Sequence, residues 1–146
     1  MIEKRKCFSQ AVLECVAKIL GATNDGLTGS EIQYLLGQSQ IIDIDPTNTK
    51  WKRLFSAFAN YQSQNQCSNS ILNFIKYALA PEKYVNRQSE FEEKRQLINQ
   101  QLGFIGYQYK ENGKFVEVQQ TTTISEAQLR ANNLKSKLES RNAHSD

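Results

Sequence analysis

The spacing of the apolar residues changes once along this sequence, at Gly103, and that change limits what the chain can fold into. Before Gly103, apolar residues recur every three or four positions, which is the period of an amphipathic helix. After Gly103 they alternate with polar residues, and Asn112-Gly113 lies between the two alternating runs. Asn-Gly in that context is the strongest short-range signal of a hairpin. We therefore expect a mainly α (α+β) fold with one β-hairpin at residues 104–118.

Capping residues and terminators divide the part before Gly103 into five helices. A Ser, Thr or Asp before an apolar stripe accepts hydrogen bonds from the first free amides, and a Gly after it ends the helix. Thr28 with Glu31 and Ser89 with Glu92 form capping boxes. The expected helices run from Ser9 to Gly21, Ser30 to Leu36 with Gly37 as terminator, Asp45 through Tyr61, Ser68 to Leu79, and Ser89 to Leu102.

The third helix carries the most regular apolar stripe. Asp45 is its expected N-cap and Pro46 its expected first residue, because a carboxylate and a residue without an N–H both suit that end of a helix. The stripe predicts a core formed by Trp51, Leu54, Phe55 and Phe58, with Tyr61 one turn further on.

The hairpin and the isoleucine run before the third helix also have informative patterns. A two-residue hairpin turn would place Tyr109 opposite Val116 and Tyr107 opposite Val118, so that these side chains share one apolar face. The β-branched run from Ile41 to Ile44 fits either a short strand or a buried connector.

The stretch after the hairpin is expected to form a separate helix. Residues 1–120 then make up a winged-helix-like domain, and residues 121–146 a C-terminal linker helix capped by Thr123 and Glu126. Its narrow apolar seam is too short for a strong coiled coil, so packing against the domain itself is favoured over pairing with a second copy. The seam consists of Ile124, Ala127, Ala131, Leu134 and Leu138.

The composition argues against a catalytic or metal site. His144, the one histidine, lies near the end of the 146 residues, so no Ser-His or Cys-His pair is expected in the core. Cys7, Cys15 and Cys67 form no C-x-x-C pair, which argues against zinc and against a disulfide framework. We therefore expect a chain that is not an enzyme and that uses no metal and no cofactor.

The length of the hydrophobic runs indicates whether the chain can cross a membrane. The longest are only a few residues, too short to cross a membrane, and the first residues lack the pattern of a signal peptide. We expect no membrane contact and a cytoplasmic location.

The polar face of the third helix suggests contact with DNA or RNA. A short helix, a connector and a longer helix follow in the order of a helix-turn-helix, and the hairpin could serve as a wing. Lys and Arg number 18 against 15 Asp and Glu, a net charge of +3 that permits phosphate contacts. The candidate nucleic-acid-binding residues are Lys50, Lys52, Arg53, Ser56, Asn60, Lys110 and Lys114.

The same residues have a plainer interpretation. Any surface helix presents a polar face with solvated lysines. The connector from Gly37 to Asp45 is longer than the turn of a compact helix-turn-helix, and its Asp43 and Asp45 would repel phosphate. The alternative function is a protein–protein interaction or homodimerisation module in which Trp51, the hairpin tyrosines or the C-terminal seam contact the partner.

Three stretches of the sequence resemble a known family. They are residues 26–32 (GLTGSEI), residues 45–55 with the run KWKRLF at their end, and residues 125–144 from SEA to RNAH. In order and spacing they resemble the N-terminal module of bacterial abortive-infection-type proteins that carry a C-terminal HEPN-type domain of the Ymh kind. The resemblance implies a recognition or regulatory module of an anti-phage defence protein, with the HEPN-type domain as its partner. It assigns no catalytic residue to this chain.

Overall fold

The computed structural model describes residues 3–128, which form a helical body with one hairpin. The predicted fold class, mainly α with a single antiparallel hairpin, is confirmed. The elements are α1 (Gln10–Leu20), α2 (Gly29–Gln38), α3 (Lys50–Asn65), α4 (Asn69–Ala78), the 3-10 helix η1 (Pro81–Tyr84), α5 (Gln88–Leu102), the 3-10 helix η2 (Gly103–Ile105), β1 (Tyr107–Tyr109) and β2 (Phe115–Glu117).

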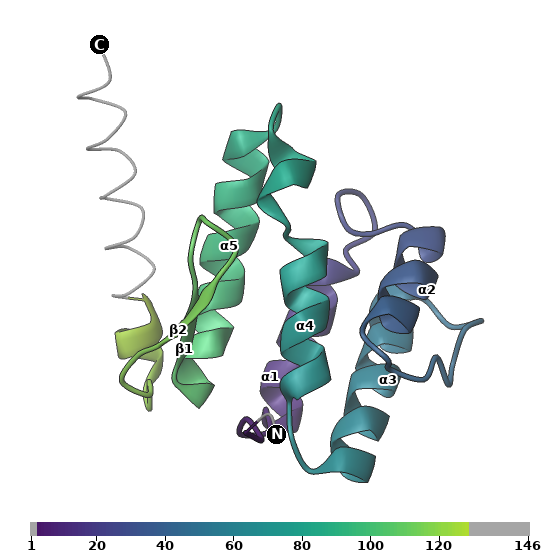
Figure 1. Cartoon of the computed structure of the whole chain (residues 1–146), viewed down its shortest axis with the longest axis horizontal. Coiled ribbons are helices and arrows are strands. Elements are labelled where there is room, and N and C mark those ends of the chain that lie inside the picture. The colour runs from purple at the N-terminus through teal and green to yellow at the C-terminus, as the bar shows by residue number, and fades with distance from the viewer. Residues whose placement is uncertain (1–2, 129–146) are drawn as a thin grey trace.

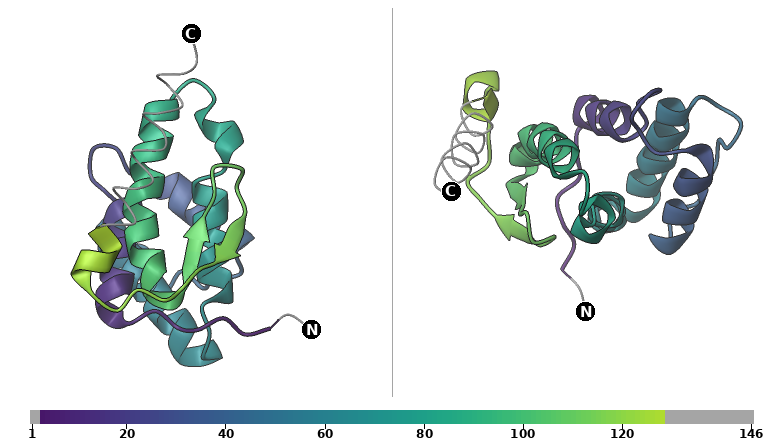
Figure 2. Two further views of the ribbon diagram at one scale, coloured as in Figure 1. Left: turned by 90° about the vertical axis from the view of Figure 1, so that its left-hand side faces the viewer. Right: turned by 90° about the horizontal axis from the view of Figure 1, so that it is seen from above.

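The helices are arranged around α1 and α4, which lie between two outer groups (Figure 1). On one side, α2 and α3 pack together, with α3 against α1 and α2 against α4. On the other side, α5 packs against α1 and carries the hairpin on its outer surface. Figure 2 shows the same order from two further directions. The hairpin therefore does not lie beside α3, where the wing of a winged helix would accompany a recognition helix.

The core is built from the inner faces of the helices. Leu54 and Phe58 of α3 are fully buried at 0% exposure, as the apolar stripe predicts. The rings of Phe58 and Phe74 meet edge to face, with centroids 5.1 Å apart. Phe55 and Trp51, also expected in the core, are only half-buried.

The predicted caps of the first two helices are present. Ser9 Oγ accepts a hydrogen bond from the Val12 amide at 3.2 Å, and both bonds of the Thr28–Glu31 capping box form. The backbone hydrogen bond from Thr28 lowers the pKa of the Glu31 carboxyl. Gly37 does not terminate its helix, which continues to Gln38.

Two predicted helix starts are wrong. The helix expected from Asp45 begins at Lys50, because residues 45–48 form a turn in which the Asp45 carboxylate accepts from Asn48 Nδ2 at 2.9 Å. Ser89 is not a cap, since α5 already begins at Gln88.

The segment between α2 and α3 is an irregular connector and contains no strand. Within it Ile41 is buried, whereas Ile42 and Ile44 are 72% and 50% exposed. The isoleucine run is therefore a connector of which one residue enters the core.

The register of the hairpin differs from the prediction by one residue. Tyr109 pairs with Phe115, not with Val116, and Tyr107 pairs with Glu117. The loop has one residue more than a two-residue turn: the Lys110 amide donates to the Lys114 carbonyl at 2.8 Å, and Gly113 takes φ +83° within the loop. A three-residue loop with a left-handed Gly is the next most common hairpin connection. Phe115 therefore shares the inner face with Tyr109, while Val116 turns outward.

The first residues after the hairpin pack on the domain. The Thr121 amide donates to the Gly103 carbonyl at 2.7 Å, and Ala127 is buried. The Glu126 amide donates to Thr123 Oγ1 at 3.2 Å as predicted, but the Glu126 carboxylate accepts from the Thr122 amide. Ile124, expected in the seam, is 73% exposed. Ala131, Leu134 and Leu138 lie outside the described residues.

Replacing Phe58 should destabilise the fold far more than replacing Phe55. Phe58→Ala leaves a cavity against Phe74 and is expected to lower the free energy of unfolding by about 3–5 kcal/mol. Phe55→Ala, at a half-buried position, should cost clearly less. Urea denaturation of the two variants measures the difference, and equal losses would contradict this assignment of the core.

The stability of the fold should fall at alkaline pH because of Tyr109. This ring is fully buried, and burial raises the pKa of its hydroxyl from 10.0 to about 12. Between those values the unfolded chain has lost the proton that the folded chain retains, so the free energy of unfolding falls as the pH rises. Below pH 10 this contribution is fully present.

Urea denaturation between pH 9 and 12 checks this expectation. Tyr109→Phe should remove part of the pH-dependent slope, although it also lowers stability at neutral pH. Tyr34→Phe, at a position that is 69% exposed, is the control and should leave the slope unchanged. Identical slopes in all three proteins would contradict the shifted pKa.

Candidate nucleic-acid interface

The first turn of α3 lies against the end of α1. A Cβ on Gly21 would lie 2.9 Å from the backbone N and Cα of Trp51, so the two chain segments meet almost backbone to backbone. This approach brings Lys18 of α1 to the Trp51 ring, with its Nζ 4.8 Å from the ring centroid. Lys52 Nζ lies 5.8 Å from the same centroid. We call Lys18, Lys50 and Lys52 around Trp51 the lysine cluster.

The electrostatics of the lysine cluster favour an anion. The amides at the start of a helix carry partial positive charge, and the N-cap of α3, Thr49, makes no side-chain hydrogen bond to them. Lys50 Nζ donates to the Thr23 carbonyl at 3.3 Å. Glu14 lies 3.8 Å from Lys18 in an exposed pair, which is the weakest kind of ion pair.

Arg53, predicted to lie on the outer face of α3, is instead inside the protein at 8% exposure. Its Nε and NH2 donate to both oxygens of Asp43, with NH2 2.5 Å from Oδ2, and its NH1 donates to the Gly29 carbonyl at 3.2 Å. The hydrogen bonds to Asp43 raise the pKa of Arg53 further. Its donors are therefore engaged within the protein, so the expected phosphate contact has no free guanidinium to make it.

The middle of α3 is covered in a similar way. Ser56 Oγ donates to the Asp45 carboxylate at 3.4 Å, so the connector carries a second acid over this helix. Asn60, the next candidate along the helix, is half-buried. The predicted outer face of α3 therefore offers fewer free donors to a DNA groove than the sequence suggested.

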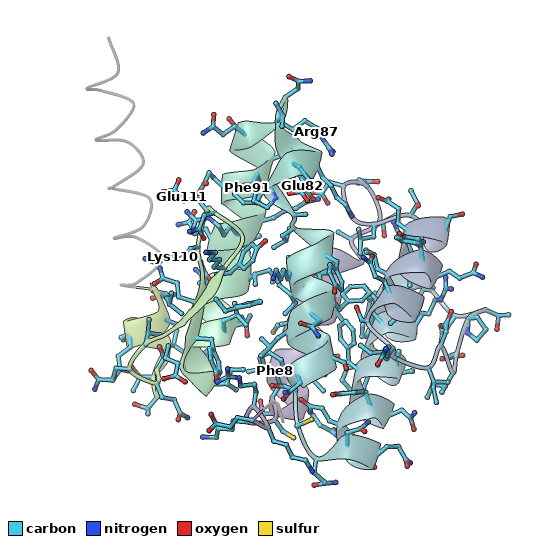
Figure 3. All side chains as sticks on the ribbon, viewed as in Figure 1. Phe8, Glu82, Arg87, Phe91, Lys110 and Glu111 are labelled. Atoms are coloured by element: carbon cyan, nitrogen blue, oxygen red, sulfur yellow. The ribbon has the colours of Figure 1, made fainter. Side chains whose placement is uncertain are left out.

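The hairpin candidates lie elsewhere. Lys110 and Lys114 are exposed and flank the hairpin loop. Figure 3 labels Lys110 beside α5, on the opposite side of the molecule from α2 and α3. The seven predicted residues thus divide into Lys50 and Lys52 of the lysine cluster, two side chains bonded to acids of the connector, one half-buried amide, and a separate pair on the hairpin.

The structure adds Lys18 to the candidates, which sequence reasoning missed. On its own helix Lys18 is an ordinary polar-face residue four positions from Glu14. Its proximity to Trp51 depends on how α1 crosses α3, and no local sequence pattern encodes that crossing.

Residues 3–128 contain no group of three or more His, Cys, Asp or Glu able to hold a metal ion. Burial raises the pKa of the Cys7 thiol, which lowers its reactivity, and Cys67 is buried with its sulfur 3.3 Å from the Tyr61 hydroxyl. None of the helices in this part of the chain has the length and apolarity needed to cross a bilayer.

Comparisons with known proteins give no relative. No protein-family model, no curated protein and no solved structure matches this chain.

The engagement of Arg53 leads to a prediction about stability. Arg53→Met keeps the aliphatic stem but leaves Asp43 without its partner, so it should lower the free energy of unfolding by about 3 kcal/mol. Lys52→Met, at the exposed position next to Arg53 in the sequence, should change it by no more than about 0.5 kcal/mol. Urea denaturation measures both, and a similar change in the two variants would refute the structural role of Arg53.

Proposed function

We propose that this chain is a non-catalytic module that binds DNA or RNA through backbone phosphates at the lysine cluster. The observation that carries the proposal is the convergence of Lys18, Lys50 and Lys52 at the uncapped start of α3. Helix N-termini and lysines are both common phosphate-binding groups.

The geometry favours phosphates over bases as the groups contacted. Lysine ammonium groups lie over the Trp51 ring, so that ring is not a free platform for stacking a base. Arg53 and Ser56, which could have read base edges, bond to acids of the connector instead. The proposed binding is therefore independent of sequence and strongly dependent on salt.

A recognition role of this kind agrees with the resemblance to abortive-infection-type defence proteins. There the module would bind nucleic acid while an HEPN-type domain supplies any ribonuclease activity. That context is part of the proposal and rests on the resemblance alone.

A second candidate function is a protein interaction surface on α2 and the connector. Tyr34, Ile42 and Ile44 are exposed by 69%, 72% and 50%, and Ile42 and Ile44 lie two residues apart on the connector. A homodimer or a partner domain would cover them. Sedimentation of wild type and of Tyr34→Ser/Ile42→Ser distinguishes self-association from a monomer.

The phosphate proposal predicts a specific change in salt dependence. Lys18→Ala/Lys52→Ala removes two charges from the cluster and leaves Lys50, which bonds to the protein, in place. The slope of log affinity against log salt should fall by about two units for a DNA duplex, because each phosphate contact contributes about 0.9. Fluorescence anisotropy with a labelled DNA duplex and a labelled RNA strand measures this slope.

Lys110→Ala/Lys114→Ala is the matched control, because it removes the same charge from the opposite side of the molecule. It should retain the wild-type slope. An equal loss in both variants would show that net charge, and not the lysine cluster, governs binding. Weak binding of wild-type protein without salt dependence would end the proposal.

A further inference from the structure

Among residues 3–128, no strand pairs with the outer edge of β2. The hydrogen-bonded pairs of the hairpin include Lys110 with Lys114 and Gly106 with Val118, at 2.8 and 2.9 Å. In an antiparallel ladder, the residues between such pairs direct their N–H and C=O groups away from the partner strand. In β2 these residues are Phe115 and Glu117, and no hydrogen bond within residues 3–128 engages their backbone groups.

The corresponding edge of β1 is already hydrogen-bonded to a side chain of α5. There the Asn99 side chain bonds both the N–H and the C=O of Tyr109, so this edge is already closed. Figure 2 shows β1 toward α5 and β2 on the outer side of the hairpin. β2 therefore offers the free edge of the sheet.

A cavity of about 440 Å³ lies beside β2, between the hairpin, α4 and the N-terminal residues. Leu72, Tyr107 and Phe115 provide its apolar walls. Asn73 is exposed at the cavity, and Arg5 donates to the Tyr107 hydroxyl at 2.8 Å. This volume is within the range of about 300–1,000 Å³ found for ligand pockets, so the cavity can receive an apolar side chain.

The two faces of the hairpin differ in character. Phe115 and Glu117 turn toward the cavity, whereas Val116 lies on the other face and is 36% exposed. Lys114 lies two residues before Val116 and therefore shares its face of the hairpin. Lys110 pairs with Lys114, so both lysines lie on that outer face. A strand added at the β2 edge would thus have an apolar cavity on one side and two cations on the other.

We propose that the β2 edge binds an extended peptide in which apolar residues alternate with Asp or Glu. The peptide backbone would pair with Phe115 and Glu117, its apolar side chains would enter the cavity, and its carboxylates would face Lys110 and Lys114. In this mode of recognition, main-chain hydrogen bonds supply affinity and pockets for alternate side chains supply specificity. The site lies apart from the lysine cluster and is independent of nucleic-acid binding there.

A nucleic-acid strand suits this edge less well. The Glu117 carboxylate lies at the cavity, 3.4 Å from Arg5, where it neutralises that cation and repels phosphate. The alternating amide and carbonyl groups of a strand edge are the complement of another peptide backbone.

The test uses labelled peptides of equal length and the full chain. The first alternates Leu with Glu, the second alternates Leu with Lys, and the third is Glu throughout. Only the first should bind saturably in fluorescence anisotropy. Its binding should slow hydrogen exchange of the Phe115 and Glu117 amides, measured by NMR.

Two pairs of variants separate the backbone and the cavity. Glu117→Pro removes the outward N–H, and Glu117→Ala removes the same carboxylate but keeps that donor. The Pro variant should bind about tenfold more weakly than the Ala variant, as expected for one hydrogen bond. Asn73→Trp should fill the cavity and abolish binding, whereas Asn73→Ala should not.

Several outcomes would overturn the proposal. They are equal affinity of the Pro and Ala variants, binding of the all-Glu peptide as strong as that of the Leu/Glu peptide, and displacement of the peptide by RNA with protection of the same amides. If Glu117→Pro does not fold, the Asn73 pair decides. Lys18→Ala/Lys52→Ala should still bind the peptide, so failure of the nucleic-acid proposal is distinguishable from failure of this one.

Discussion

One side chain of α5 holds the hairpin in place by bonding to it as a neighbouring strand would. Asn99 donates to the Tyr109 carbonyl at 3.0 Å and accepts from the Tyr109 amide at 2.7 Å. Beside it Arg95, at 1% exposure, donates to the same carbonyl and pairs with Glu92 at 2.6 Å. An isolated two-stranded hairpin is marginal in water, so these contacts fix both its position and the cavity between it and α4.

The hairpin also shows where sequence reasoning reaches its limit. Asn112-Gly113 predicted the loop correctly, but it fits both a two-residue turn and a longer loop that ends in a left-handed Gly. The choice between them shifts the pairing by one residue, and a shift of one residue moves every side chain of β2 to the other face. In the observed register Phe115 lies opposite Tyr109, with the ring centroids 5.0 Å apart, and Gly113 lies close to Pro81.

The helices were largely predictable because their signals are local. Stripes and caps located α1, α2, α4 and the end of α5 to within a few residues. Asp45-Pro46 gave a wrong start for the third helix, because the same pair suits a turn as well as a helix start. Here Asn48 donates to Asp45 and completes the turn. The site was predictable only in part: Lys50 and Lys52 are adjacent in sequence to Trp51, but Lys18 and the Asp43 partner of Arg53 come from other segments.

The buried arginines and the surface lysines have different roles in this structure. Arg53 and Arg95 are buried. Arg53 joins α3 to Asp43 of the connector and to the Gly29 carbonyl at the start of α2, and Arg95 joins α5 to the Tyr109 carbonyl of the hairpin. The planar guanidinium, with five donors, suits such bridging, whereas the lysine ammonium is a strongly hydrated point charge. Lys18, Lys52, Lys110 and Lys114 accordingly remain at the surface. The charge available to a ligand therefore depends on the lysines and their positions, which are on α1 and α3 in one group and beside the hairpin loop in the other.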